Sequence, residues 1–251
     1  VTSNQMRELD AAAIASGISG DVLMQTAGEG LAAAIRRLEE LHQLVDAPVL
    51  FVTGCGNNGG DAFVAARCLH EDDRPVECWL AGPQDKLHGD ALTHFRLMKK
   101  AGVPTRIMEH PDDWAHAAEC GTEAEIIVDG LLGTGASGEP RGIIGDAVAF
   151  IDGQADRALV VAVDVPSAMA VRADLTVTMG LPKIDCVQPE NIDAVGNLEV
   201  VDIGIPPESV SAIKGCADIE LIQPSELVPL FPRRTRDAHK GDYRSEEHTS
   251  E

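Results

Sequence analysis

The first part of the chain alternates apolar and polar positions with the period of amphipathic helices. Between residues 3 and 44, apolar side chains recur three or four positions apart, beginning with Met6 and Leu9. Gly17, Ser19 and Gly20 interrupt this pattern, and Asp21 stands where a side chain could cap a second helix. The pattern therefore predicts two helices at the N-terminus.

From residue 49 onward, short apolar runs alternate with amphipathic segments. The apolar runs predict strands at residues 49–53, 76–81, 126–129, 159–164, 175–179 and 198–203. The segments between them predict helices at residues 63–70, 89–101 and 142–152. Continuous apolar strands that alternate with helices are typical of a parallel sheet covered on both faces. We therefore expect a Rossmann-like three-layer α/β/α fold, with a doubly wound, mostly parallel sheet and additional N-terminal helices.

Polar, glycine-containing loops directly follow three of the predicted strands. They are residues 54–61 (GCGNNGGD), 129–138 (DGLLGTGASG) and 164–167 (DVPS). Ligands of doubly wound proteins bind beyond the carboxyl ends of the strands. Three such loops at one edge of the sheet therefore predict a ligand site.

The first loop combines glycines with two adjacent asparagines. Its glycines allow a close approach of backbone to ligand, and the helix after it offers N–H groups to a phosphate. The loop is neither G-x-G-x-x-G nor a Walker A sequence, because no Lys-Ser/Thr pair follows. Asn57 and Asn58 supply amide oxygens that a simple turn does not need. The plain alternative is a tight turn with Asp61 as a helix cap.

The other two loops each begin with a carboxylate at a strand tip. Asp129 suits a cation or a ligand hydroxyl, and Asp164 suits proton transfer at the mouth of a buried strand. In the plain alternative, Asp129 caps a turn and Asp164 hydrogen-bonds the backbone before a rigid proline. Ser167 lies in no G-x-S-x-G sequence and has no evident histidine partner, which argues against a hydrolase triad. Lys183, after a later strand, could contact an anion, but it is interpreted as a solvated lysine.

Composition narrows the possible partners. The chain has 20 basic and 41 acidic residues, a net charge of −21, so we expect neither nucleic acid nor a membrane as partner. An anionic small molecule would need backbone N–H groups and a bound cation to create local positive potential. Six scattered cysteines form no C-x-x-C pair, and no secretory pattern is present at the start. We therefore expect a cytoplasmic protein.

Five segments, in order and sensibly spaced between Met6 and Pro206, resemble one family. They are residues 56–61 (GNNGGD), 128–135 (VDGLLGTG), 163–167 (VDVPS), 176–183 (TVTMGLPK) and 201–206 (VDIGIP). Together they resemble the YjeF N-terminal family, the NAD(P)H-hydrate epimerases. The resemblance implies repair of damaged nicotinamide cofactors: the R and S epimers of hydrated NADH or NADPH are interconverted, so that a dehydratase can use the S form.

The resemblance also implies roles for individual residues. A potassium ion would be the cofactor, held by Asn58, Asp129 and Ser167. Asp164 would contact the substrate. Our own mechanistic hypothesis is that Asp164 acts as general acid and base at the hydrated carbon, through a planar iminium open to attack from either face. Substrate binding is implied for Asn57, Asn58, Gly59, Gly60, Asp61, Gly133, Thr134, Gly135, Ala136, Ser137, Gly138, Glu139 and Asp164.

One segment departs from the family pattern. The family continues after Pro-Ser with Gly-Leu and a polar, glycine-containing stretch, whereas this chain runs from Ser167 through residues 168–172 directly into Ala173. Ala62 stands where the family usually has glycine. The shorter connection adjoins the implied potassium ligands. It leaves open a second interpretation, a binding module that keeps the nucleotide pocket without turnover.

The C-terminal part carries a second resemblance. Residues 236–243 (RDAHKGDY) resemble the start of the ADP- or ATP-dependent NAD(P)H-hydrate dehydratase, which many microbes fuse behind the epimerase. We thus expect a bifunctional parent, with a fused or separate dehydratase as partner, and a possible homodimer face on the N-terminal helices. Residues 244–251 resemble a translated sequencing adapter. The expected division is an epimerase domain at 1–223, a linker and truncated dehydratase at 224–243, and an artefactual tail at 244–251.

Overall fold

The computed structural model describes residues 1–44, 46–135, 138–213, 215, 222 and 224–230. Contacts divide the chain into two units, Val1–Cys216 and Ala217–Glu251. The dehydratase-like residues 236–243 and the tail 244–251 lie outside the described residues. Among the described helices, none combines the length and the apolar character needed to cross a membrane.

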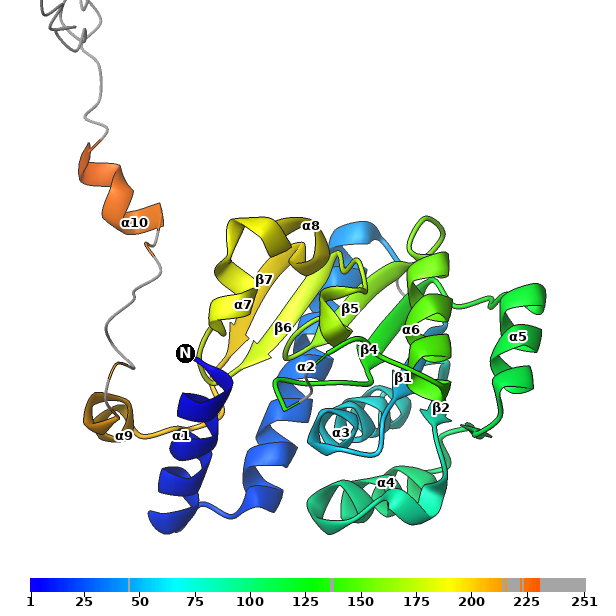
Figure 1. The fold of residues 1–251 in the computed structure, drawn as a ribbon, viewed down its shortest axis with the longest axis horizontal. Helices are drawn as coiled ribbons and strands as arrows, with labels where there is room; N and C mark the ends of the chain where they lie inside the picture. Colours follow the sequence, from blue (N-terminus) through cyan, green and yellow to red (C-terminus); the bar gives the residue numbers. More distant parts are fainter. Residues whose placement is uncertain (45, 136–137, 214, 216–221, 223, 231–251) are drawn as a thin grey trace, which may run out of the picture. The chain divides into compact units, whose positions relative to one another are not determined.

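A sheet of seven parallel strands forms the centre of the first unit (Figure 1). Its order is β3-β2-β1-β4-β5-β6-β7, so the chain winds outward from β1 to one edge and then from β4 to the other. The predicted doubly wound α/β fold is confirmed. The strands are β1 Val49–Thr53, β2 Val76–Ala81, β3 Thr105–Met108, β4 Ile126–Gly130, β5 Leu159–Val163, β6 Leu175–Met179 and β7 Asn197–Val201.

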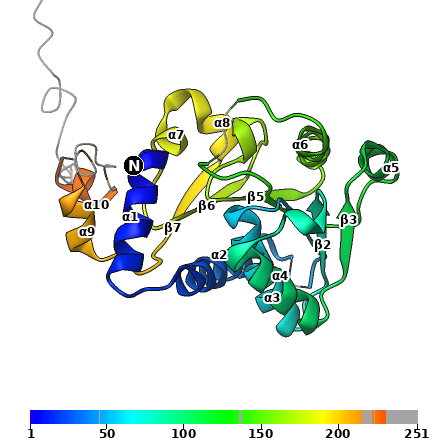
Figure 2. The ribbon, with the colours of Figure 1, turned by 60° about the horizontal axis from the view of Figure 1, so that its bottom comes forward.

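Helices cover both faces of this sheet. Figure 2 shows α2, α3 and α4 on one side and α6, α7 and α8 on the other. The helices of this unit are α1 Ser3–Ala15, α2 Gly20–His42, α3 Asn57–Glu71, α4 Gly89–Ala101, α5 Pro111–Cys120, α6 Ile143–Gln154, α7 Ile184–Val187, α8 Ile192–Val195 and α9 Pro207–Ala212. The second unit contributes α10 Pro224–Leu227.

The central strands are apolar because both of their faces are buried. In β1, Val49 and Phe51 belong to the core under α2 and α3, while Leu50 and Val52 belong to the core under α5 and α6. Side chains alternate between the faces of a strand, so a strand buried on both sides needs an unbroken apolar run. Each large side chain buried in this way stabilises the fold by about 1.5–3 kcal/mol.

Two helix starts differ from the prediction. The first residue of α2 is preceded by Ser19, whose Oγ accepts a hydrogen bond from the Val22 N–H at 3.3 Å, so Ser19 and not Asp21 is the cap. Helix α3 begins at Asn57, which places Asp61 inside the helix and rules out a capping role. A Cβ on Gly59 would lie 2.1 Å from the Gly54 carbonyl oxygen, so glycine is required for α3 to start this close to β1.

Candidate active site

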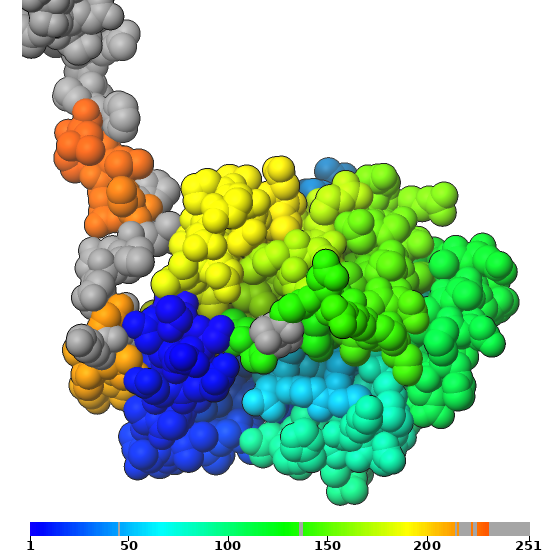
Figure 3. Space-filling model, viewed as in Figure 1, coloured from blue at the N-terminus to red at the C-terminus, as the bar shows by residue number. Residues whose placement is uncertain are grey.

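A cavity of about 630 Å³ opens where β1, β4 and β5 end, at the point where the strand order reverses. This is where doubly wound proteins bind their ligands. All three predicted loops contribute to its lining, and α1 and α2 add a wall that the sequence did not place there. On the face drawn in Figure 3, α1 (dark blue) meets the start of α3 (cyan) and the loop after β4 (green).

The cavity contains about half of the implied substrate-binding residues. Its lining includes Asn57, Asn58, Asp61, Gly133, Thr134, Gly135 and Asp164. Gly59 and Gly60 are buried within α3 and do not line it, and Gly138 and Glu139 are exposed away from it. Ala136 and Ser137 lie outside the described residues. The implied ligands Asp129 and Ser167 are fully buried behind the lining.

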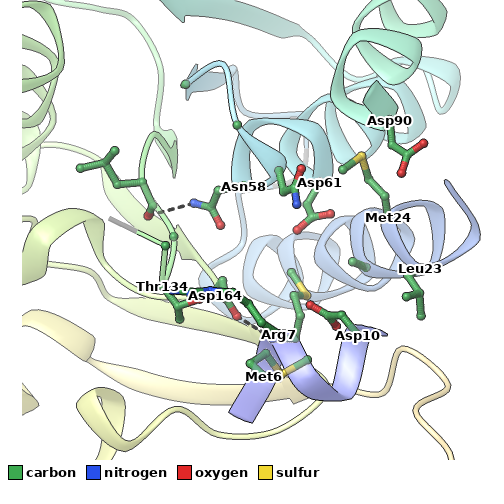
Figure 4. A pocket seen from close by; sticks show the side chains of 18 of the residues that line it. Met6, Arg7, Asp10, Leu23, Met24, Asn58, Asp61, Asp90, Thr134 and Asp164 are labelled. Atoms are coloured by element: carbon green, nitrogen blue, oxygen red, sulfur yellow. Dashed lines mark hydrogen bonds between the residues drawn. The ribbon is translucent and has the colours of Figure 1, made fainter. Parts of the chain in front are cut away.

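Hydrogen bonds join Asn58, Asp129 and Ser167 with Leu132 into one network, here called the polar floor. The Ser167 N–H donates to Asp129 Oδ2 at 2.8 Å and the Ser167 hydroxyl to Asp129 Oδ1 at 2.6 Å. The Leu131 N–H donates to the same Oδ1 at 3.2 Å. Asn58 Nδ2 donates to the Leu132 carbonyl at 3.1 Å (Figure 4). Loops from three strand ends are thereby tied together.

Asp129 is a buried carboxyl surrounded by neutral hydrogen-bond donors. Burial raises its pKa to about 6, and the hydrogen bonds from Ser167 and Leu131 oppose this effect. The turn interpretation holds in part, because Asp129 does accept the N–H of Leu131. It accepts two further hydrogen bonds from Ser167, in the next loop. The side chain therefore fixes one loop against another.

The shortened connection after Ser167 keeps that residue in place but holds the next two in a left-handed conformation. Ala168 and Met169 have φ values of 56° and 52°. Glycine adopts this region freely, whereas other residues lose about 1 kcal/mol or more there. Ala168 occupies the position where the family pattern has glycine. The connection thus retains the Ser167–Asp129 contact at the cost of local strain.

Asp164 forms an ion pair with Lys183 at the edge of the cavity. The interpretation of Lys183 as solvated is wrong: its side chain is only 2% exposed, and its ammonium also donates to the Met179 carbonyl at 2.6 Å. Asp164 Oδ1 accepts from the Met179 N–H at 3.2 Å and from the Thr178 hydroxyl at 3.3 Å. The backbone partner of the Asp164 side chain is therefore Met179 on β6, and not the segment before Pro166 that the plain alternative named.

Asp61 and Asp10 form a second acidic feature, here called the acidic wall. Asp61 lies on α3, Asp10 on α1, and both line the cavity (Figure 4). Burial raises the pKa of Asp61 well above its ordinary value, and the negative charge of Asp164 adds to the effect. Burial also raises the pKa of Asp10. Sequence reasoning missed Asp10, although it lies four positions after Met6, on the same face of the helix.

Other chemistries find little support at this cavity. Cys55 lines it, but burial raises the pKa of the thiol, which disfavours a nucleophilic thiolate. Within the described parts of the chain, no three His, Cys, Asp or Glu side chains gather to hold a metal ion. Any cation at the polar floor would therefore depend on neutral oxygens together with Asp129.

Comparison with known proteins identifies the fold and the family. The family described as "YjeF-related protein N-terminus" matches residues 20–184. The crystal structure of yeast ynu0 is similar to this chain with a TM-score of 0.64 and 22% identity, covering 73% of this chain and 81% of that one. At this identity the likeness shows the fold alone.

Curated relatives extend the comparison. An "NAD(P)H-hydrate epimerase" of Rhodopirellula baltica is 32% identical over 83% of this chain and 85% of its own length. A protein of the same name from Pirellula staleyi is 34% identical over 80% and 90%. The "Bifunctional NAD(P)H-hydrate repair enzyme Nnr" of Coxiella burnetii is 34% identical over 96% of this chain but 48% of its own length. The chain spans about half the length of such bifunctional relatives, and it belongs to the YjeF N-terminal family.

Proposed function

We propose that this chain is an NAD(P)H-hydrate epimerase, which interconverts the R and S epimers of hydrated NADH and NADPH. The observation that carries the proposal is the ion pair between half-buried Asp164 and buried Lys183 at the switch-point cavity, among the loops that hold the family's motifs. The cavity volume of about 630 Å³ is that of a small-molecule site. Two relatives named NAD(P)H-hydrate epimerase, matched over most of their length, support the same activity.

Backbone groups at the cavity suit a dinucleotide diphosphate. Helix α3 starts at Asn57 on the cavity lining, and the first N–H groups of a helix have no intrahelical partner. The loop Gly133–Gly135 lines the same cavity and has no side chain at its two glycines. In a chain with a net charge of −21, such N–H groups supply local positive potential where surface lysines and arginines do not.

The proposed reaction is loss and return of a hydroxyl group at the hydrated carbon. The hydroxyl oxygen takes a proton and leaves as water with the C–O bonding electrons, and the ring nitrogen's lone pair stabilises the planar cation. Water then adds to either face and gives back one proton, which yields either epimer. We place Asp164 beside this carbon, where it assists both steps while Lys183 fixes its position.

The polar floor has oxygen atoms that could coordinate a potassium ion. Asn58, Asp129 and Ser167 would hold it, since potassium prefers neutral amide and hydroxyl oxygens with one carboxylate. The buried charge of Asp129 has neutral donors around it in the described residues, so a cation would offset the penalty that burial places on it. When bound, the ion would add positive potential near the substrate's diphosphate.

The intact protein is proposed to be longer and bifunctional. The chain covers about half of the relatives named "Bifunctional NAD(P)H-hydrate repair enzyme Nnr". We propose that a dehydratase, fused or separate, consumes the S epimer that this part supplies.

The test uses purified chain and R-NADHX, with proton NMR following the appearance of the S epimer. Parallel reactions contain equal concentrations of potassium or sodium chloride. We expect conversion well above the uncatalysed rate, and faster conversion and a higher melting temperature in potassium. The exposed Asp112 on α5 gives a matched control, since Asp112→Asn removes the same charge outside the cavity. Substrate binding without conversion would contradict the proposal and favour the binding module.

A further inference from the structure

The contacts of Asp164 are those of a hydrogen-bond acceptor. Its Oδ1 accepts from the Met179 N–H and the Thr178 hydroxyl and forms the ion pair with Lys183. All three partners are donors, and each of them meets the same oxygen. Within the described residues Oδ2 has no partner, so it is left to face a ligand. A reaction that begins by protonating a leaving hydroxyl still needs a side chain that carries a proton before the reaction starts.

Asp61 has the opposite environment. Its side chain lies on the same cavity, but no donor or counter-ion from the described part of the chain contacts its carboxyl group. Asp61 is half-buried, and a carboxylate that is partly removed from water without such partners is disfavoured relative to the neutral acid. Burial and the negative charge of Asp164 accordingly raise the pKa of Asp61, and the positive charge of Lys183 only partly opposes this.

The charges that face Asp61 are mostly negative. Figure 4 shows its carboxyl group on α3 pointing toward the part of the cavity where Asp10 lies on α1. Arg7 is on the cavity rim but forms no ion pair with Asp61 in the described residues. The ionisable groups around this cavity are Arg7 and Asp10 from α1, Cys55 from the loop after β1, Asp90 from α4, Asp164 after β5 and Lys183 after β6.

We propose that Asp61 is the catalytic proton donor of the epimerisation, paired with Asp164 as the ionised partner that faces the cationic intermediate. This inference rests on the proposed function. The Asp61 O–H bond breaks as the proton passes to the substrate hydroxyl, and the C–O bond breaks with its electrons leaving on water. On return, water adds to the other face and its extra proton restores the Asp61 acid. Two carboxyl groups in unlike environments thereby divide the work that the sequence assigns to Asp164.

The test compares Asp61→Asn, Asp61→Glu and Asp10→Asn with the wild-type chain between pH 5 and 9. Conversion of R-NADHX is followed by NMR, and the uncatalysed rate is subtracted at each pH. Because the acid form is required, the wild-type rate should fall as the pH rises through the ionisation of Asp61. Asp61→Asn should lower kcat by 10²–10⁴-fold and abolish this alkaline fall. Asp61→Glu should recover part of the rate.

Binding and control measurements separate catalysis from structure. The dissociation constant of Asp61→Asn for the hydrated cofactor, measured by fluorescence quenching, should stay within about threefold of the wild type. Asp112→Asn should leave both rate and pH profile unchanged.

An Asp61→Asn rate within threefold of the wild type, or an unchanged alkaline fall, would overturn the proposal, as would loss of that fall in Asp10→Asn alone. An inactive wild-type chain would instead overturn the proposed function itself.

Discussion

The polar floor and the acidic wall are two neighbouring groups of polar residues with opposite hydrogen bonding. In the floor, each oxygen of the Asp129 carboxyl meets a donor from another loop. In the wall, Asp61 and Asp10 border the cavity, and in the described residues their carboxyl groups have no such donor. Both side chains are half-buried, and carboxyl groups with raised pKa values that line a cavity are candidates for contact with a ligand. The contrast indicates that the floor holds the loops together and the wall serves the ligand.

The largest predicted effect comes from removing the counter-ion of Asp164. Lys183→Met removes the buried ammonium and leaves Asp164 without its counter-ion. Breaking such a pair costs about 3–5 kcal/mol, so the midpoint of urea unfolding should fall strongly. Lys183→Arg keeps the charge and serves as the control, which should lose less. An unfolding free energy unchanged in Lys183→Met would contradict the account of this ion pair.

Breaking the polar floor should have the next largest effect. Asp129→Ala leaves the Ser167 and Leu131 N–H groups without their acceptor, at a cost of about 2–3 kcal/mol. Circular dichroism during urea unfolding measures this loss. If the floor also binds potassium, the extra stability given by potassium over sodium should vanish in the same variant. A variant that keeps wild-type stability would show that the network does not hold the loops.

For the acidic wall, the predicted effect is a dependence of the folding stability on pH. The folded-state pKa of Asp61 is raised, so the folded chain binds the proton more tightly than the unfolded chain. This contribution to stability is complete below the unfolded pKa of about 4 and is lost as the pH rises toward the folded value.

Asp61→Asn removes this dependence, at about 1.4 kcal/mol for each unit between the two pKa values. The difference in unfolding free energy between wild type and Asp61→Asn should therefore decrease from pH 4 to 7. A constant difference would contradict the raised pKa of Asp61.

The smallest effect concerns the connection beside the floor. Ala168 has a φ of 56°, a conformation that glycine adopts without a steric penalty. Ala168→Gly should therefore stabilise the chain by up to about 1 kcal/mol, after the entropy cost of glycine in the unfolded state is included. Differential scanning calorimetry detects this as a rise in melting temperature of a few degrees. A lower melting temperature would indicate that the connection is not strained.

Local pattern predicted the sheet well because the central strands are buried on both faces. The runs at β1, β2 and β6 were predicted with the bounds that the structure shows. Strand β3 was missed because it is a sheet edge whose residues Arg106 and Ile107 are exposed, so it has no continuous apolar run. Helix α3 starts earlier than predicted because glycines and asparagines usually indicate a loop, whereas here they allow close packing.

The site was predictable where it follows from strand ends and hidden where it depends on tertiary packing. Loops after parallel strands must meet at one edge, so Asn58, Asp129 and Asp164 could be grouped from sequence. Nothing local distinguishes Lys183 from a solvated lysine, because its burial is created by Asp164 and the Met179 carbonyl. The raised pKa of Asp61 likewise depends on neighbours distant in the chain.

The most direct test of the central claim is epimerisation by the wild-type chain compared with Asp164→Asn. Both proteins would be given R-NADHX in potassium chloride, and NMR would follow the S epimer. The account predicts rapid conversion by the wild type and a loss of at least 100-fold in Asp164→Asn, with substrate still bound. Equal conversion by both proteins would contradict the role of the Asp164–Lys183 pair in this cavity.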